Sequence, residues 1–411
     1  MAQINLILNQ EEMQELLSKD RDGAFRKLLE SSLNGILKAE SAQQLGAERY
    51  ERSEERTDSR NGTRERRLQT RIGKLTLEVP RHRNVPFKTL VFDNYKRSEA
   101  ALIATMAEMS VNGVSTRKVK NVMETLCGAT PSKSAVSEAC KELDKAVEAF
   151  RNRPLTDEYP FVMVDATYFK VREEQRIKGK AMMVAIGTDR EGRREILGFG
   201  VYASESRETW KEFLEMLKKR GLHGVKMITS DAHEGIIHAV GKVFPEVPWQ
   251  RCQTHFSRNI LDKVPKKYQA DIHNRLLRMY NCSTIEEARK VRDEIIEEYH
   301  DVAEKAMECL DDGFDSVMTV MVLPVSMRRF FRTSNHLERL NRELKRRSGV
   351  IGIFSNAASL ARLIGSVLIE QNEIYTAHSR TNFQREDIEK LDVATADLRE
   401  IARTQQSLLV A

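Results

Sequence analysis

The sequence has few cysteines, no long apolar run and no secretion signal, and each absence excludes a class of protein. Its five cysteines are odd in number and widely scattered, which fits reduced thiols better than a disulfide framework. No segment has the roughly 18 consecutive apolar residues of a transmembrane helix. The N-terminal stretch MAQINLILNQEEMQELLSKD lacks the charged start and long apolar core of a signal peptide. We therefore expect a soluble, cytoplasmic protein without a membrane partner.

Basic residues are in modest excess, and the excess is concentrated in two segments. The chain has 67 Lys and Arg against 61 Asp and Glu. Residues 59–84 contain eight basic and two acidic residues, and residues 328–347 contain the same numbers. Two basic clusters in a mildly basic chain indicate an extended polyanion as partner, with nucleic acid as the first candidate. The alternative is a pair of solvated charged faces.

The N-terminal part of the sequence predicts three small modules. Residues 1–58 carry apolar side chains at helical spacing, typical of a helical module. In residues 59–97, apolar and polar residues alternate between turn-forming glycines, which predicts a small basic β-hairpin. Residues 98–153 contain two short helical segments around Gly128–Pro131, a spacing that predicts a helix-turn-helix-like DNA-binding region. A plain three-helix bundle would give the same pattern.

Residues 154–255 have the most regular pattern of the chain, with five strand-like runs and two helices. The runs are 161–171, 180–188, 195–203, 225–230 and 247–252. Their order, β-β-β-α-β-α-β, resembles the ribonuclease H-like fold, in which the first strand lies in the middle of the sheet beside the fourth. Asp165 and Asp231 would then be neighbours, although 66 positions separate them.

The remaining sequence predicts mostly helices, so the fold class is mixed α/β. Residues 256–327 are rich in helix formers and read as an all-α insertion into the core. Residues 328–380 complete the core and contain an amphipathic helix with a leucine stripe, and residues 381–411 form a helical tail.

Three acidic residues have the chemistry of a two-metal site. An aspartate after the apolar run FVMV is costly to desolvate unless a cation lies beside it. Mg²⁺ prefers oxygen ligands, and two such ions can activate the attacking oxygen and stabilise the leaving oxygen at a phosphate. We expect Asp165 to bridge two Mg²⁺ ions, with Asp231 and Glu338 each holding one, and Mn²⁺ as a possible substitute. The alternative for Glu338 is an ion pair with Arg342, one helical turn later.

The motifs VDATY, SDAH, CQTH and SNHLERLNRELKRR together resemble the Mutator-like family of DDE transposases, in its bacterial insertion-sequence branch. The segment RNGTRERRLQTRIGKLTLEVPRHR is also similar to the region before that family's catalytic domain. The resemblance covers residues from about 50 to 380. It implies a ribonuclease H-like catalytic core interrupted by the helical insertion, with Asp165, Asp231 and Glu338 as the catalytic residues.

Further residues are predicted to assist or to contact DNA. The resemblance includes the Cys252-x-x-His255 element, which alone is half a zinc site, so packing, help with the chemistry and metal binding all stay open. Asn335 is a third assisting candidate beside Glu338. Trp210 is either a core aromatic or a stacking platform for a distorted base. The basic residues expected at DNA phosphates are Arg64, Arg66, Arg67, Arg71, Arg81, Arg83, Arg339, Arg342, Lys345, Arg346 and Arg347.

The function predicted from these features is transposition. We expect the protein to bind the terminal inverted repeats of its own insertion sequence, cleave a phosphodiester and join the end to target DNA, as a homodimer or larger assembly on paired ends. Two alternatives are a catalytically silent DNA-binding regulator and another ribonuclease H-like nuclease. A sugar hydrolase that uses two of the acids would leave the basic clusters without a purpose.

Overall fold

The structure is a computed structural model that describes residues 21–48, 51, 56–70, 73–89, 100–127, 133–141, 143–377 and 383–410. The chain divides into two compact units, Met1–Glu142 and Leu143–Ala411. Helix α6 (Asp144–Asn152), predicted from the sequence to be part of the helix-turn-helix-like region, belongs to the second unit. No helix in the described part of the chain is long and apolar enough to cross a membrane.

The N-terminal unit contains the predicted hairpin and a group of short helices. Helix α2 (Arg21–Leu45) packs on the antiparallel strands β1 (Arg60–Thr70) and β2 (Gly73–His82). Leu37 meets Leu75, Leu77 and Val79 there, and the alternation of these strand residues with exposed polar ones explains why one face of the hairpin is apolar. Three helices surround a second core, namely α3 (Ala100–Val111), α4 (Thr116–Cys127) and α5 (Lys133–Lys141).

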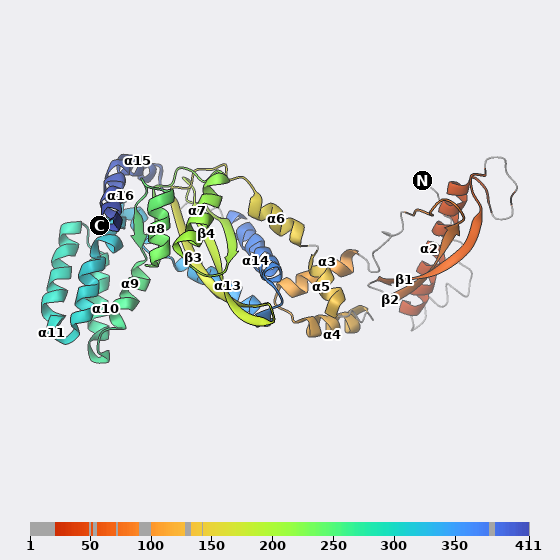
Figure 1. The fold of residues 1–411 in the computed structure, drawn as a ribbon, viewed down its shortest axis with the longest axis horizontal. Helices are drawn as coiled ribbons and strands as arrows, with labels where there is room; N and C mark the ends of the chain where they lie inside the picture. Colours follow the sequence, from red (N-terminus) through yellow and green to blue (C-terminus); the bar gives the residue numbers. More distant parts are fainter. Residues whose placement is uncertain are drawn as a thin grey trace. The chain divides into compact units, whose positions relative to one another are not determined.

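A mixed sheet forms the centre of the second unit (Figure 1). Its strands are β3 (Phe161–Glu173), β4 (Arg176–Thr188), β5 (Arg194–Tyr202), β6 (Met227–Ser230), β7 (Trp249–Arg251) and β8 (Ile353–Phe354). The order is β5-β4-β3-β6-β7, and β8 pairs with β3. Pairing is antiparallel on the β4 side of β3 and parallel on the β6 side. The predicted neighbourhood of the first and fourth strands is confirmed, as is the mixed α/β class.

Helices cover both faces of this sheet. Helices α7 (Arg207–Lys219) and α8 (Glu234–Val243) pack on the face that carries Val162 and Val164. The opposite face carries Phe161, whose ring stacks on Phe331 with ring centres 3.6 Å apart. Two further helices that contact β3 are α13 (Asn335–Ser348) and α14 (Ala357–Ala377). Because Phe161 and Val162 point to opposite faces and are both buried, the run before Asp165 is fixed from both sides.

The insertion between β7 and α13 is entirely helical, as predicted. Its elements are α9 (Gln253–Leu261), α10 (Lys266–Tyr280), α11 (Ile285–Met318), the 3₁₀ turn η1 (Thr319–Val322) and α12 (Val325–Phe331). These helices enclose a core of their own that includes Phe256, Leu276, Ile295 and Phe314. The insertion is therefore a self-supporting body attached to the sheet.

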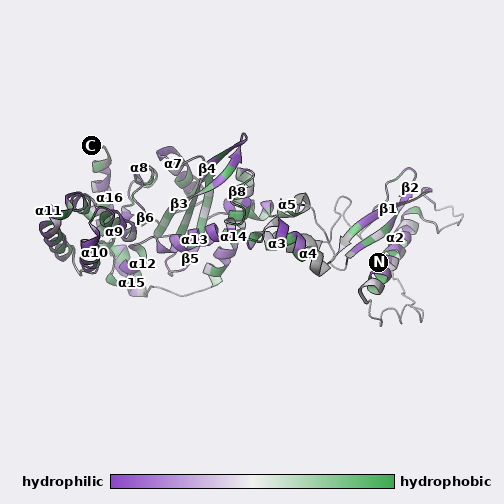
Figure 2. Cartoon of the chain, turned by 90° about the horizontal axis from the view of Figure 1, so that it is seen from below, coloured by the Kyte–Doolittle hydropathy of each residue, from purple (hydrophilic) through white to green (hydrophobic). Residues whose placement is uncertain are grey.

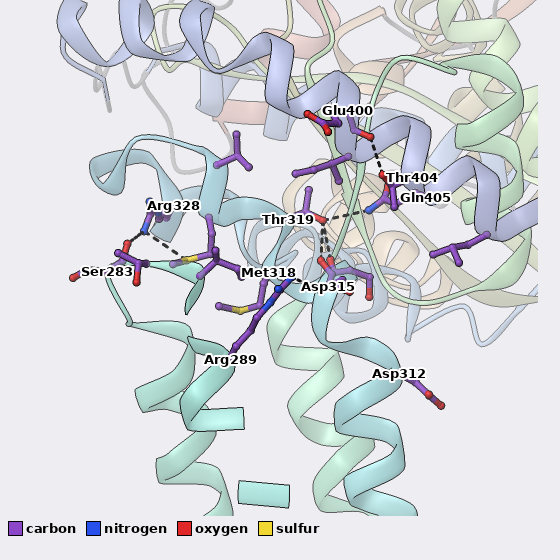
Figure 3. A pocket seen from close by; sticks show the side chains of 17 residues that line it. Ser283, Arg289, Asp312, Asp315, Met318, Thr319, Arg328, Glu400, Thr404 and Gln405 are labelled. Atoms are coloured by element: carbon purple, nitrogen blue, oxygen red, sulfur yellow. Dashed lines mark hydrogen bonds and ion pairs between the residues drawn. The ribbon is translucent and has the colours of Figure 1, made fainter. Parts of the chain in front are cut away.

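The C-terminal helices α15 (Arg385–Val393) and α16 (Thr395–Val410) attach the insertion to the sheet. Gln405 on α16 accepts from the Trp249 N–H at 2.8 Å and donates to the Trp249 carbonyl at 2.9 Å. The same amide donates to Thr319 at 3.3 Å, beside a cavity of about 540 Å³ that α11, η1 and α16 enclose (Figure 3). None of the described residues that line this cavity is a predicted catalytic or DNA-binding residue.

Asp58 joins the two ends of the N-terminal hairpin. Its carboxylate accepts from the backbone N–H groups of Ser59 (2.7 Å), Asn84 (2.9 Å) and Val85 (2.9 Å). These bonds, that from Val85 foremost, lower the Asp58 pKa from 3.8 to about 2. A lowered pKa means that the stabilisation is complete above pH 3.8 and is lost as the pH falls toward 2.

We predict that Asp58→Asn speeds amide hydrogen exchange in β1 and β2 at neutral pH, because the neutral amide is a weaker acceptor for the backbone donors. The difference from the wild type should shrink as the pH falls from about 4 to about 2. Glu65→Gln, at an exposed position of β1, is the matched control and should exchange like the wild type. Equal exchange for Asp58→Asn and wild type at neutral pH would contradict the prediction.

Candidate active site

Parallel pairing of β3 with β6 brings the two predicted aspartates to equivalent positions. The last paired residues are Met163 and Thr229; Asp165 lies two residues farther along β3, and Asp231, also two residues farther, directly follows the end of β6. Residues two apart point to the same face, and neighbouring strands lie about 4.8 Å apart. Asp165 and Asp231 therefore lie side by side. Asp165 belongs to the stretch of β3 that follows its pairing with β6 and precedes its pairing with β8.

Asp165 is half-buried and held at both oxygens. Its Oδ1 accepts from the Ala166 N–H and its Oδ2 from the Asn341 side-chain amide, each at 2.8 Å. Burial and the neighbouring Asp231 carboxylate raise the Asp165 pKa to about 7, while the hydrogen bond from the Ala166 N–H and, to a smaller extent, His255 oppose the shift. Two carboxylates in this position repel each other, so the site favours a cation between or beside them.

Glu338 lies on the first turn of α13, where the Cys252-x-x-His255 element positions the helix. Cys252 is fully buried, and its Sγ accepts from both the N–H and the hydroxyl of Ser334 at 3.3 Å. Its own N–H donates to the Ser230 carbonyl at 2.8 Å, directly before Asp231. His255, one turn later, places Nε2 3.3 Å from Glu338 Oε1. Cys252 and His255 thus connect the strand end that carries Asp231 to the helix that carries Glu338.

The same contacts shift the pKa values of Cys252 and His255. Burial raises the Cys252 pKa, but hydrogen bonds from His255 and Ser334 outweigh it and the net shift is downward. The neighbouring Cys252 thiol raises the His255 pKa, and the Glu338 and Asp165 carboxylates add to that shift. The raised pKa favours the protonated imidazole beside the acids.

The residues present fit a hard divalent cation, although they are not gathered into a ready-made metal cluster. Among the described residues, no three His, Cys, Asp or Glu side chains form a group that could hold a metal ion. However, Asp231 Oδ1 and Asn341 Oδ1 are buried without a hydrogen-bond partner, and buried Glu338 Oε1 has only the contact with His255 Nε2 at 3.3 Å. Buried acceptors of this kind need a partner. Mg²⁺ takes oxygen ligands and keeps several of its waters, so one or two carboxylates suffice for it.

Two residues of the site, Asn341 and Glu205, were not predicted from the sequence. Asn341 is buried and lies one helical turn after Glu338, so α13 presents an acid and an amide toward β3. The sequence placed Asn341 off the leucine stripe but gave no reason to pair it with Asp165. Glu205, before α7, is a half-buried carboxylate that interacts with both aspartates, and burial raises its pKa with help from Asp231. No pattern in the sequence pointed to Glu205.

The structure places Trp210 in the core, so the predicted role as a base-stacking platform is wrong. The ring is fully buried against Phe213, with ring centres 5.9 Å apart. Its Nε1–H donates to Glu205 Oε2 at 3.3 Å. A completely buried indole has no face for a base, and its connection to the site runs through Glu205.

The basic side chains of α13 fall into free and paired groups. Arg339, Arg342 and Lys345 are exposed and make no ion pair within the described part of the chain. Arg346 is exposed but pairs with Glu343 at 2.7 Å. Arg347 is buried and pairs with both Glu343 and Glu370. The predicted phosphate contact by Arg347 is therefore wrong, since this guanidinium joins α13 to α14. Glu338 faces His255 rather than Arg342.

The other predicted contact residues lie on the surface where they are described. Arg64, Arg67, Arg81 and Arg83 are exposed on or beside the N-terminal hairpin and Arg66 is half-buried, whereas Arg71 lies outside the described residues. Asn335 is exposed on the first turn of α13 and accepts from Thr254 at 3.4 Å.

Comparison with known proteins shows the family to which the chain belongs. The family model described as "Transposase, Mutator family" matches residues 1–378. The chain is 40% identical over 391 residues to the transposase for insertion sequence element IS256 in transposon Tn4001 of Staphylococcus aureus, covering 94% of this chain and 100% of the relative. It is 39% identical over 368 residues to the transposase for insertion sequence element ISRM5 of Rhizobium meliloti, covering 90% and 92%.

A third relative is the transposase for insertion sequence element IS1081 of Mycobacterium tuberculosis, 36% identical over 375 residues, with 91% of this chain and 90% of the relative covered. Matches of this identity and length extend across both compact units. The chain therefore belongs to the Mutator family of transposases.

Proposed function

We propose that this transposase cuts and joins DNA at Asp165, Asp231 and Glu338, on a ribonuclease H-like core. The observation that carries the proposal is the equal register of Asp165 and Asp231 beyond the last β3–β6 pair, with α13 bonded to Asp165 through Asn341. The strand order, with β3 between β4 and β6, supports the fold assignment.

Each residue of the site has a separate role in the proposed reaction. Two Mg²⁺ ions, when bound by the three acids, would activate the attacking oxygen and stabilise the leaving oxygen of an in-line displacement. Asn341 holds Asp165 in one orientation, and the buried run of β3 keeps that strand rigid. His255 sits against Glu338 and offsets its charge. The exposed Arg342 and Lys345 bind backbone phosphates close to the reacting one.

DNA recognition in this proposal belongs mainly to the N-terminal unit. The exposed arginines of the hairpin contact the terminal inverted repeats, and α4 and α5 read them as a helix-turn-helix-like pair. Joining two ends requires a homodimer or a larger assembly, acting on DNA in the cytoplasm. A silent regulator would have no use for three acids in this arrangement, which favours the enzyme over that alternative.

We predict that Asp165→Asn abolishes Mg²⁺-dependent cleavage of a duplex carrying the element's own terminal sequence, because the neutral amide cannot bridge cations. Binding of the same duplex should be unchanged. Cleavage is measured on a labelled duplex with Asp262→Asn, an exposed aspartate of the insertion, as control. An Asp165→Asn protein that still cleaves and joins the duplex would falsify the assignment.

Asn341→Leu should slow cleavage about 10- to 100-fold and raise the Mg²⁺ concentration needed for half-maximal rate, since a partner that orients a metal ligand has effects of that size. Leucine is of similar size and cannot donate to Asp165, so packing is largely kept while the hydrogen bond is lost. The control is Asn274→Leu on the exposed surface of α10. A slower rate with an unchanged Mg²⁺ requirement would assign Asn341 a merely structural role.

A further inference from the structure

Strands β3 and β4 continue past the site as a two-stranded ribbon. They stay paired from Asp165 opposite Val184 to Glu173 opposite Arg176, and the turn follows at Glu174 and Gln175. Figure 2 shows this end of the ribbon projecting from the unit and coloured mainly hydrophilic. The ribbon extends about 23 Å from Asp165 to Arg172, at roughly 3.3 Å per residue.

The two faces of the ribbon differ in character. Phe169 and Val171 are buried on one face, where Phe169 meets Phe354 of β8 edge to face. The other face carries Tyr168, Lys170 and Arg172, all exposed, and we call these three residues the ribbon face. Successive members lie two residues apart, or about 6.6 Å, so they form a row along the strand. Gly179 lies opposite Lys170 and leaves the Tyr168 ring uncovered on that side.

The cations of the ribbon face have no acidic partner, unlike those of the opposite face. Lys178 pairs with Glu174 at 3.0 Å and Lys180 with Glu173 at 2.9 Å. Lys178 is opposite Val171 and Lys180 is opposite Phe169, which places both lysines on the buried-side face. Lys170 and Arg172 make no ion pair with any described residue. The acids at the tip of the ribbon are thus already neutralised.

Tyr168 and Asp165 point to opposite faces of β3, and Glu205 connects the ribbon face to the active site. Tyr168 is 50% exposed, and its hydroxyl accepts from the Glu205 N–H at 3.1 Å. Glu205 is the half-buried carboxylate that interacts with Asp165 and Asp231. A row that begins with an aromatic ring bonded to Glu205, a neighbour of the acids, and continues with two free cations matches a polyanionic strand that reaches the site past Glu205.

We propose that the ribbon face binds the backbone of the DNA that leads to the scissile phosphate. Lys170 and Arg172 contact phosphates, and Tyr168 packs against a sugar or base nearer the site. The identity of this DNA rests on the proposed function. A second copy of the chain fits the face less well, because two unpaired cations without acids would have to be desolvated against a protein surface.

Salt dependence of DNA binding tests the proposal, with a control built into the ribbon. Lys170→Ala/Arg172→Ala and Lys178→Ala/Lys180→Ala remove the same charge from opposite faces. The full-length protein is titrated with a duplex carrying the terminal sequence and its flank, in EDTA, at several salt concentrations. Each lost phosphate contact lowers the slope of log K against log salt by about 0.9, so the first variant should lose about 1.8 and the second close to zero.

Equal slopes for the two variants would overturn the proposal, and so would a change in sedimentation of Lys170→Ala/Arg172→Ala without DNA, which would indicate a protein contact. Because Lys170 and Arg172 are both exposed, we expect the variant to unfold at the wild-type midpoint temperature. An unchanged midpoint excludes misfolding as the cause of weaker binding. Binding is measured without metal, whereas the proposed function is tested by Mg²⁺-dependent cleavage with wild type and Asp165→Asn. The two ideas can therefore fail separately.

Discussion

The parallel pairing of β3 with β6 is the constraint on which the site depends. Three pairs, from Phe161 with Met227 to Met163 with Thr229, set the register of the two strands. A slip of one residue would turn Asp231 to the opposite face of the sheet from Asp165. The register is secure because these strand residues are buried on both faces of the sheet. Apolar packing thus keeps two repelling carboxylates side by side.

Strand pairing does not position the third acid, because Glu338 lies on a helix more than a hundred residues farther along the chain. Cys252 positions it instead, because it forms hydrogen bonds with Ser230, directly before Asp231, and with Ser334, directly before α13. The whole helical insertion leaves the sheet at β7 and returns at α12, between these two anchor points. The insertion can therefore vary in size or shape without moving Glu338, provided that the contacts of Cys252 are kept.

The sequence predicted the features that depend on local pattern and strand order. Apolar runs ending in Asp165 and Asp231 and a leucine stripe behind Glu338 are visible as periodicity, and the element order then brings the strands together. The hydrogen bond from Asn341, the carboxylate of Glu205 and the burial of Trp210 and Arg347 arise from contacts between distant elements. Periodicity predicts that Arg347 lies on a helix. It does not predict the ion pair of Arg347 with Glu370 on the neighbouring helix.

The basic residues of the second unit fall into two groups, those paired with acids of the fold and those without such a partner. Arg347 and the ribbon lysines neutralise nearby acids and so stabilise helix and strand packing. The unpaired cations Lys170, Arg172, Arg339, Arg342 and Lys345 lie on β3 and α13, the elements that carry Asp165 and Glu338. In the proposed function, DNA phosphates would be the partners of these free cations, and metal ions would be the partners of the acids. Binding of both would relieve the repulsion among the acids and among the cations, which the folded chain alone does not neutralise.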